Sequence, residues 1–166
     1  MSKVYVISDT HFGHKNITKY RPQFKTAEEH DAVLLQNIKN VVSKRDILIM
    51  LGDIAFNTEA LMKLKSIECR KQLILGNHDM QFSRVDILKL YEVFTRVDAL
   101  RSYKGVWLSH APIHPDELRG KKNVHGHTHF NSIEDPRYFN ACVEQLDYKP
   151  KLFTEIKEIF DETNLH

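Results

Sequence analysis

The sequence contains little cysteine, glycine and proline. Its two cysteines, Cys69 and Cys142, form no Cys-x-x-Cys pair, which disfavours a closed structural zinc site built on thiolates. We therefore expect both thiols to be buried as small apolar side chains. Six glycines and five prolines among 166 residues, with no low-complexity tract, exclude a disordered or fibrous chain.

Long apolar runs and a strong charge bias are also absent. No run approaches the roughly 18 apolar residues of a membrane span, and the apolar stretch in residues 3–8 is too short for a signal peptide. We therefore expect a cytoplasmic protein without a membrane partner. Because 24 basic and 22 acidic residues leave a net charge of only +2, the chain does not resemble a DNA-coating protein. Its length and 42% hydrophobic content predict one domain over residues 1–166.

The apolar patterns predict alternating strands and helices in the first half of the chain. Helices are expected at 26–43, where Thr26-Ala-Glu-Glu29 forms a capping box, at 58–67 with Thr58 as the cap, and at 83–91 with Ser83 as the cap. Strands are expected at 3–8, 46–51 and 72–75. The second half predicts a hairpin of 93–103 with 106–109, short strands at 123–125 and 138–144, and a closing helix at 154–162. Such a chain is an α/β protein that can stack two sheets between helices.

Histidine is the residue type in excess. The chain has ten histidines, and five of them fall between residues 110 and 129. Metal-type side chains follow five predicted strand ends, in the segments Asp9-Thr-His11, Gly52-Asp53, Gly76-Asn-His-Asp79, Ser109-His110 and Gly126-His-Thr-His129. Because ligands of open α/β sheets bind beyond the carboxyl ends of strands, we expect these segments to converge on one site.

The segments supply more ligands than one ion with an open position needs. The seven candidate metal ligands are Asp9, His11, Asp53, Asn77, His110, His127 and His129. Carboxylate, imidazole and amide groups without thiolates favour Mn²⁺, Fe, Zn²⁺ or Mg²⁺ in an open hydrolytic site. Seven ligands suit two ions joined by one bridging carboxylate, an arrangement that clamps phosphorus for in-line attack.

The ordered motifs resemble the calcineurin-like metallophosphoesterase superfamily. Residues 9–17 and 140–150 are in addition similar to small single-domain bacterial and phage phosphoesterases. The resemblance implies a four-layer α/β/β/α sandwich of two mixed sheets flanked by helices. It implies that Asp53 bridges two ions and that His78 faces the phosphate and protonates the leaving oxygen. It assigns the remaining ligands to a first ion, bound by Asp9, His11 and His129, and to a second ion, bound by Asn77, His110 and His127.

These residues predict a dinuclear metal-dependent phosphoesterase, in which a hydroxide that bridges the ions attacks phosphorus in line. We expect two divalent ions, Mn²⁺ first, with Fe, Zn²⁺, Ni²⁺ or Mg²⁺ as alternatives. A phosphodiesterase is favoured, because little of the chain remains for a cap domain that would enclose a small metabolite. The substrate is expected to be a phosphoester. A nucleotide-like phosphoester is one form of this hypothesis. A nucleotide or protein phosphatase, a nuclease and a non-catalytic scaffold remain alternatives.

Three residues near the first motif are candidate substrate contacts. His14 and Asn16 lie in the loop that follows Asp9, and Arg21 belongs to a basic stretch in which its guanidinium could grip a phosphate with two hydrogen bonds. His30 is expected to be solvated. The sequence leaves the oligomeric state open.

Overall fold

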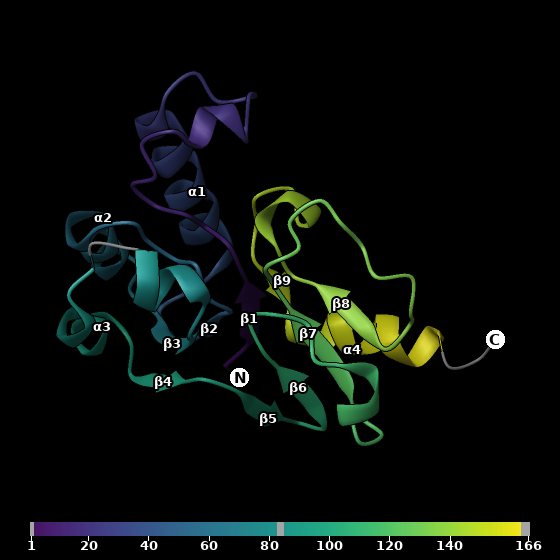
Figure 1. Ribbon diagram of the computed structural model, residues 1–166. Helices are drawn as coiled ribbons and strands as arrows, with labels where there is room; N and C mark the ends of the chain where they lie inside the picture. The colour runs from purple at the N-terminus through teal and green to yellow at the C-terminus, as the bar shows by residue number, and fades with distance from the viewer. Residues whose placement is uncertain (1, 83–84, 164–166) are drawn as a thin grey trace.

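The computed structural model describes residues 2–82 and 85–163. Its first sheet has the strand order β4-β3-β2-β1-β9 (Figure 1). Four of these strands run parallel, whereas β9 pairs antiparallel with β1. The strands are β1 (Val4–Ile7), β2 (Ile47–Met50), β3 (Arg70–Ile74), β4 (Arg96–Asp98) and β9 (Lys151–Leu152).

The second sheet has the order β5-β6-β7-β8, with β5 antiparallel to β6 and the other neighbours parallel. Its strands are β5 (Arg101–Tyr103), β6 (Val106–Leu108), β7 (Lys122–His125) and β8 (Tyr138–Asn140). An isolated parallel bridge between Ser8 and Cys142 links the segment after β1 to the segment after β8. Both sheets are therefore mixed, and the predicted fold class, two mixed sheets with flanking helices, is confirmed.

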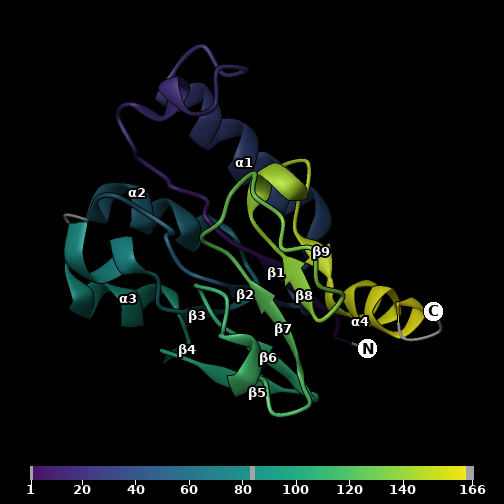
Figure 2. The same ribbon diagram turned by 45° about the vertical axis from the view of Figure 1, so that its right-hand side comes forward.

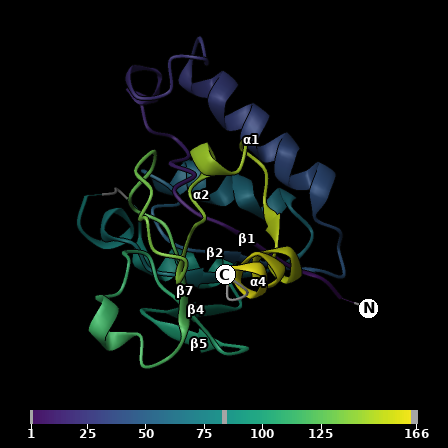
Figure 3. The ribbon, with the colours of Figure 1, turned by 90° about the vertical axis from the view of Figure 1, so that its right-hand side faces the viewer.

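Helices flank the sheets. Figures 1 and 2 show α1, α2 and α3 on one side of the first sheet and strands β6–β8 on the other. Helix α4 packs beside β1 and β9, and Figure 3 shows it near the C-terminus, below α1. The helices are α1 (Ala27–Val41), α2 (Thr58–Lys63), α3 (Ile87–Val93) and α4 (Phe153–Glu162). Among the described residues, none of the helices combines the length and apolar character of a bilayer span.

The first sheet is apolar on both faces, because each face covers a core. In β1, Tyr5 and Ile7 pack with the helices α1–α3, whereas Val6 faces the second sheet. The inter-sheet core also contains Phe153 and Ile156 of α4. Alternate side chains of one strand thus serve two cores, which is the pattern expected of a buried parallel strand.

Most predicted elements are present, with shifted ends. Thr26 caps α1, since its Oγ1 accepts from the Glu29 amide at 3.0 Å. Asn57 rather than Thr58 caps α2, and Asp86 caps α3. The predicted cap Ser83 lies outside the described residues. Both cysteines are buried free thiols, as expected.

Residues 93–103 do not form the single strand that their pattern predicts. They divide into the end of α3, then β4, which pairs with β3, and then β5, which pairs with β6. The hairpin turn is confirmed: Lys104 and Gly105 both have positive φ, 47° and 82°, as the favoured two-residue hairpin turns require. An alternating pattern specifies that a strand has a buried face, but not which of two sheets buries it.

Candidate metal centre

The predicted ligands follow the carboxyl ends of β1, β2 and β3 in the first sheet and of β6 and β7 in the second. Asp53 Oδ2 lies 3.8 Å from His11 Nε2, 3.4 Å from His110 Nε2 and 3.9 Å from His78 Nε2. Segments separated by tens of residues therefore meet around one buried carboxylate, as the strand-end positions predict.

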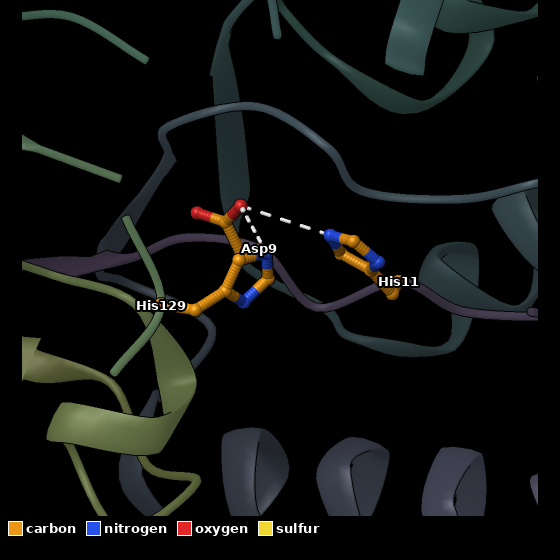
Figure 4. A group of neighbouring side chains, drawn as sticks. All are labelled: Asp9, His11 and His129. Atoms are coloured by element: carbon orange, nitrogen blue, oxygen red, sulfur yellow. Dashed lines mark ion pairs between the residues drawn. The ribbon is translucent and has the colours of Figure 1, made fainter. Parts of the chain in front are cut away.

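A first group consists of Asp9, His11 and His129 (Figure 4). Asp9 Oδ1 lies 3.7 Å from His11 Nε2 and 3.6 Å from His129 Nε2. Asp9 Oδ1 and His11 Nε2 are buried, and neither has a hydrogen-bond partner among the described residues. Because a buried polar atom without a partner is costly, two such atoms on either side of a shared space fit a cation between them.

A second group consists of Asp53, His110 and His127, whose ligand atoms all lie within 4.8 Å of one another. Asn77 Oδ1 joins it, at 2.9 Å from His110 Nε2. His110 Nδ1 lies 2.8 Å from the Leu51 carbonyl, so it donates there and leaves Nε2 for the group. Asp53 lies between the two groups, which fits the role of a shared ligand.

Backbone conformation at the ligands is unusual. Five of the seven predicted ligands adopt positive φ, with Asp9 at 56°, His11 at 53°, Asp53 at 54°, His127 at 71° and His129 at 49°. Each such residue costs roughly 1–2 kcal/mol relative to an ordinary backbone conformation. Strain of this kind persists where the surrounding structure over-determines it, and it clusters at functional sites.

Glycines leave room for the two carboxylates. A Cβ on Gly76 would overlap Asp53 Oδ1, and a Cβ on Gly126 would overlap Ser8 Oγ and Asp9 Oδ2. These two glycines of the Gly-Asn-His-Asp and Gly-His-x-His motifs therefore allow a close approach of the backbone to the ligands.

Asp79 holds the loops that carry Asp53 and Asn77. Its Oδ2 accepts from the amides of Asp53 (2.9 Å) and Gly76 (2.8 Å), and its Oδ1 accepts from the Ile54 amide (2.9 Å). Burial raises the pKa of Asp79 to about 6. Asp79 thus orders the turn around Asp53 without being part of either ligand group.

The buried carboxylates of the centre carry negative charge that neighbouring positive charge stabilises. Burial acts to raise the pKa of Asp9, but the neighbouring imidazole of His11 and the charge of His110 bring it well below its ordinary value. Burial acts to lower the pKa of His110, but Asp53 and Asp9 raise it to about 9. Without cations, a protonated His110 partly offsets the negative charge of Asp9 and Asp53. Bound cations can offset the same charge.

Arg21 lines a cavity beside His11, His14 and His78, but its guanidinium is not available for the predicted phosphate contact. It is 1% exposed. All five of its N–H donors have acceptors within the protein: Glu144 Oε1 twice, the carbonyls of Asp9 and Thr10, and His30 Nε2. No donor is left for a phosphate. Arg21 instead orders the backbone of the first motif from behind.

His30 and Glu144 complete this buried network, and the sequence did not single them out as site residues. His30 is buried rather than solvated, because its Nδ1 lies 3.0 Å from Asp31 Oδ1 while its Nε2 accepts from Arg21. Glu144 Oε1 lies 2.9 Å from His129 Nδ1, so this nitrogen donates and Nε2 is presented toward Asp9. The only available signal for Glu144 was its place in the similar segment 140–150.

The other two candidate substrate contacts differ in their positions. His14 lies near the first group, with its ring centroid 6.1 Å from that of His11 and 4.4 Å from that of Phe56. Asn16 is exposed at the start of a short 3₁₀ turn, Ile17–Lys19, and the structure does not bring it to either group. Phe56, which has no chemical signal in the sequence, also contacts the ring of His78, at 5.0 Å between centroids.

Two known proteins are similar to this chain in sequence. The chain is 38% identical over 160 residues to the uncharacterized protein MJ1445 of Methanocaldococcus jannaschii, with 90% of this chain and 86% of that protein covered. It is 34% identical over 163 residues to the Gene 66 protein of Mycobacterium phage L5, with 78% of each covered.

A solved structure has the same fold. The crystal structure of AQ665 from Aquifex aeolicus, a protein of unknown function, matches with a TM-score of 0.76 and 30% identity, covering 96% of this chain and all of the other. The family model for calcineurin-like phosphoesterases matches residues 2–162, a range that includes all seven predicted ligands. This chain therefore belongs to the calcineurin-like phosphoesterase family.

Proposed function

We propose that the protein is a phosphodiesterase that works with two divalent cations, Mn²⁺ first among them. Its family and its two groups of metal-type side chains support a metal-dependent phosphoesterase. The observation that carries the dinuclear hypothesis is the position of Asp53, whose Oδ2 lies 3.8 Å from a histidine of one group and 3.4 Å from a histidine of the other.

In this proposal Asp53 is shared by the two ions. Asp9, His11 and His129 would hold the first ion, and Asn77, His110 and His127 would hold the second. When bound, the pair supplies positive charge that offsets the anionic phosphoester and lowers the pKa of the attacking water.

His78 acts on the substrate rather than on the ions. Its backbone amide donates to Asp53 Oδ1 at 2.8 Å, while its side chain is 31% exposed. This anchors the residue beside the shared carboxylate and leaves the ring accessible to a substrate. As the phosphorus–oxygen bond to the leaving group breaks, His78 gives a proton to the departing oxygen.

The preference for diesters is supported by the openness of the centre. His127 is exposed, so the second group faces solvent and leaves space for a second ester group on phosphorus. A nucleotide-like substrate and a cytoplasmic location stay predictions. A phosphomonoesterase, a nuclease and a non-catalytic scaffold each predict a different result in the experiment below.

The experiment compares hydrolysis of bis-p-nitrophenyl phosphate, p-nitrophenyl phosphate and a fluorogenic oligonucleotide by wild type and His78→Ala, each loaded with Mn²⁺. We expect the first substrate to give the highest kcat/KM, and His78→Ala to lose about 10²–10⁴-fold in kcat while metal analysis still finds two ions. The exposed His114 serves as the control in His114→Ala, which should match wild type.

Each alternative has its own outcome. Faster hydrolysis of the monoester would support a phosphatase, and preferential cleavage of the oligonucleotide would support a nuclease. Full activity of His78→Ala would overturn the assignment of the acid. A protein that binds no metal and hydrolyses none of the three would be a scaffold.

A further inference from the structure

A cavity of about 410 Å³ lies beside the candidate metal centre. His11, His78 and His129 line it, so it is continuous with the site at which the phosphoester is expected to react. Aromatic side chains form other parts of its lining: Tyr20, Phe56 and Phe130. A group in this cavity would lie next to a phosphoester held at the centre.

The aromatic lining is contiguous with the reactive histidines. The ring of Phe56 lies 5.2 Å from that of His11 and 5.0 Å from that of His78, measured between centroids. His14 packs edge-on against Phe56 at 4.4 Å and against Tyr20 at 5.8 Å. A flat group attached to a phosphate held at the centre would lie against these rings.

Two of the aromatic side chains that line the cavity are largely exposed. Tyr20 is 66% and Phe130 is 64% exposed, although each presents a large apolar ring to water. They come from distant segments, one from the loop after β1 and one from the loop after β7. Exposed aromatic rings that line the same cavity are typical of a surface that gains its contacts from a ligand.

The cavity also carries polar atoms that an apolar ring would not satisfy. Glu144 and His14 both line it, and Glu144 Oε2 and His14 Nδ1 are buried without a hydrogen-bond partner among the residues described. Glu144 Oε2 can only accept a hydrogen bond when ionised. A suitable occupant therefore combines a flat ring with hydrogen-bonding groups, including at least one donor.

We propose that this cavity binds the base of a nucleoside phosphoester, stacked on the aromatic side chains, with donors of the base or its sugar directed to Glu144 and His14. A nucleobase has both the flat face and the polar edge that the cavity requires, whereas a simple aryl group has the face alone. The inference rests on the proposed phosphoesterase function and specifies the substrate class for the same centre.

The test measures direct binding by titration calorimetry to the Mn²⁺-loaded protein. The probes are adenosine 5′-monophosphate, ribose 5-phosphate, which lacks the base, and phenyl phosphate, which has a ring without polar edges. We expect adenosine monophosphate to bind about 5- to 100-fold more tightly than ribose 5-phosphate, with phenyl phosphate weaker than the nucleotide.

Single substitutions test whether the preference for the nucleotide arises in this cavity. Tyr20→Ala and Phe130→Ala should each lower affinity for adenosine monophosphate about 5-fold or more, and leave ribose 5-phosphate binding unchanged. Tyr91→Ala is the matched control, because Tyr91 is 67% exposed on α3 and is not part of the cavity lining. It should bind all three probes as wild type does.

Equal affinities for the nucleotide and ribose 5-phosphate, or phenyl phosphate binding as tightly as the nucleotide, would overturn the inference. Hydrolysis of bis-p-nitrophenyl phosphate is measured on the same samples. Hydrolysis without a preference for the base contradicts the base site alone. A preference for the base without hydrolysis contradicts the phosphodiesterase proposal and supports the base site.

Discussion

The two ligand groups of the centre are supported in different ways. Behind the first group lies a buried network of ionisable side chains, in which Glu144 joins His129 to Arg21 and Arg21 joins His30. The second group is held by hydrogen bonds that involve the main chain. His110 donates to the Leu51 carbonyl, and the backbone amide of Asp53 donates to the Asp79 carboxylate.

Exposure follows the same division. Two members of each group are buried, but the third member of the first group, His129, is only partly exposed, whereas the third member of the second group, His127, is exposed. Side chains held by buried charged partners lose less freedom when they bind an ion. We therefore expect the first group to bind its ion more tightly, and the second group to exchange its ion more readily.

The largest effect is expected where the two groups meet. Asp53→Asn removes the charge that both ions would share, so we expect loss of both ions and a fall in kcat of about 10³-fold or more. Metal analysis after gel filtration and hydrolysis of bis-p-nitrophenyl phosphate measure this. Retention of both ions by the variant would show that the groups are independent sites.

A second change acts on the first group through packing. Gly126→Ala places a methyl group against Ser8 and the Asp9 carboxylate, so we expect it to cost about 1–3 kcal/mol of unfolding free energy and to weaken binding of the tighter ion. Denaturant unfolding and metal titration measure the two effects. Gly105→Ala is the control, since nothing lies within 4 Å of its added Cβ; its positive φ of 82° makes it strained, but it should leave metal binding unchanged.

The smallest effect is expected from the network. Glu144→Gln removes the carboxylate that orients His129 and pairs with Arg21, so affinity for the tighter ion should fall about 10- to 100-fold, with the weaker ion unaffected. Calorimetric titration with Mn²⁺ compares the variant with Glu158→Gln, an exposed position on α4. Equal weakening of both ions would refute the division between the groups.

Short sequence motifs correctly predicted the helix start and the hairpin turn, because neighbouring residues alone specify them. The capping box places the start of α1 at Thr26, and Lys104-Gly105 places a hairpin turn, because side-chain caps and positive φ act within a few residues. The division of residues 93–103 between two sheets escaped prediction, because both sheets bury the same apolar pattern and the choice between them depends on distant partners.

The same distinction holds for the centre. Residue type and position after a strand identified every member of the two groups, since metal chemistry restricts ligands to a few side chains. Those two criteria did not reveal that Arg21 uses its donors within the protein or that His30 is buried. Basic side chains in a loop or on a helix surface are usually solvated, and only the contacts with Glu144 and Asp31 give these two side chains a structural role.

Side-chain type and short-range periodicity were enough to predict a metal-dependent hydrolytic centre on an α/β framework, and the order of the motifs carried the resemblance to the phosphoesterase family. Which side chains support the ligands, and which rings form the wall of the adjoining cavity, became apparent only in three dimensions. Tyr20, Phe56 and Phe130 lie far apart in sequence and carry no distinguishing pattern, so their common role arises from packing between segments that no local rule connects.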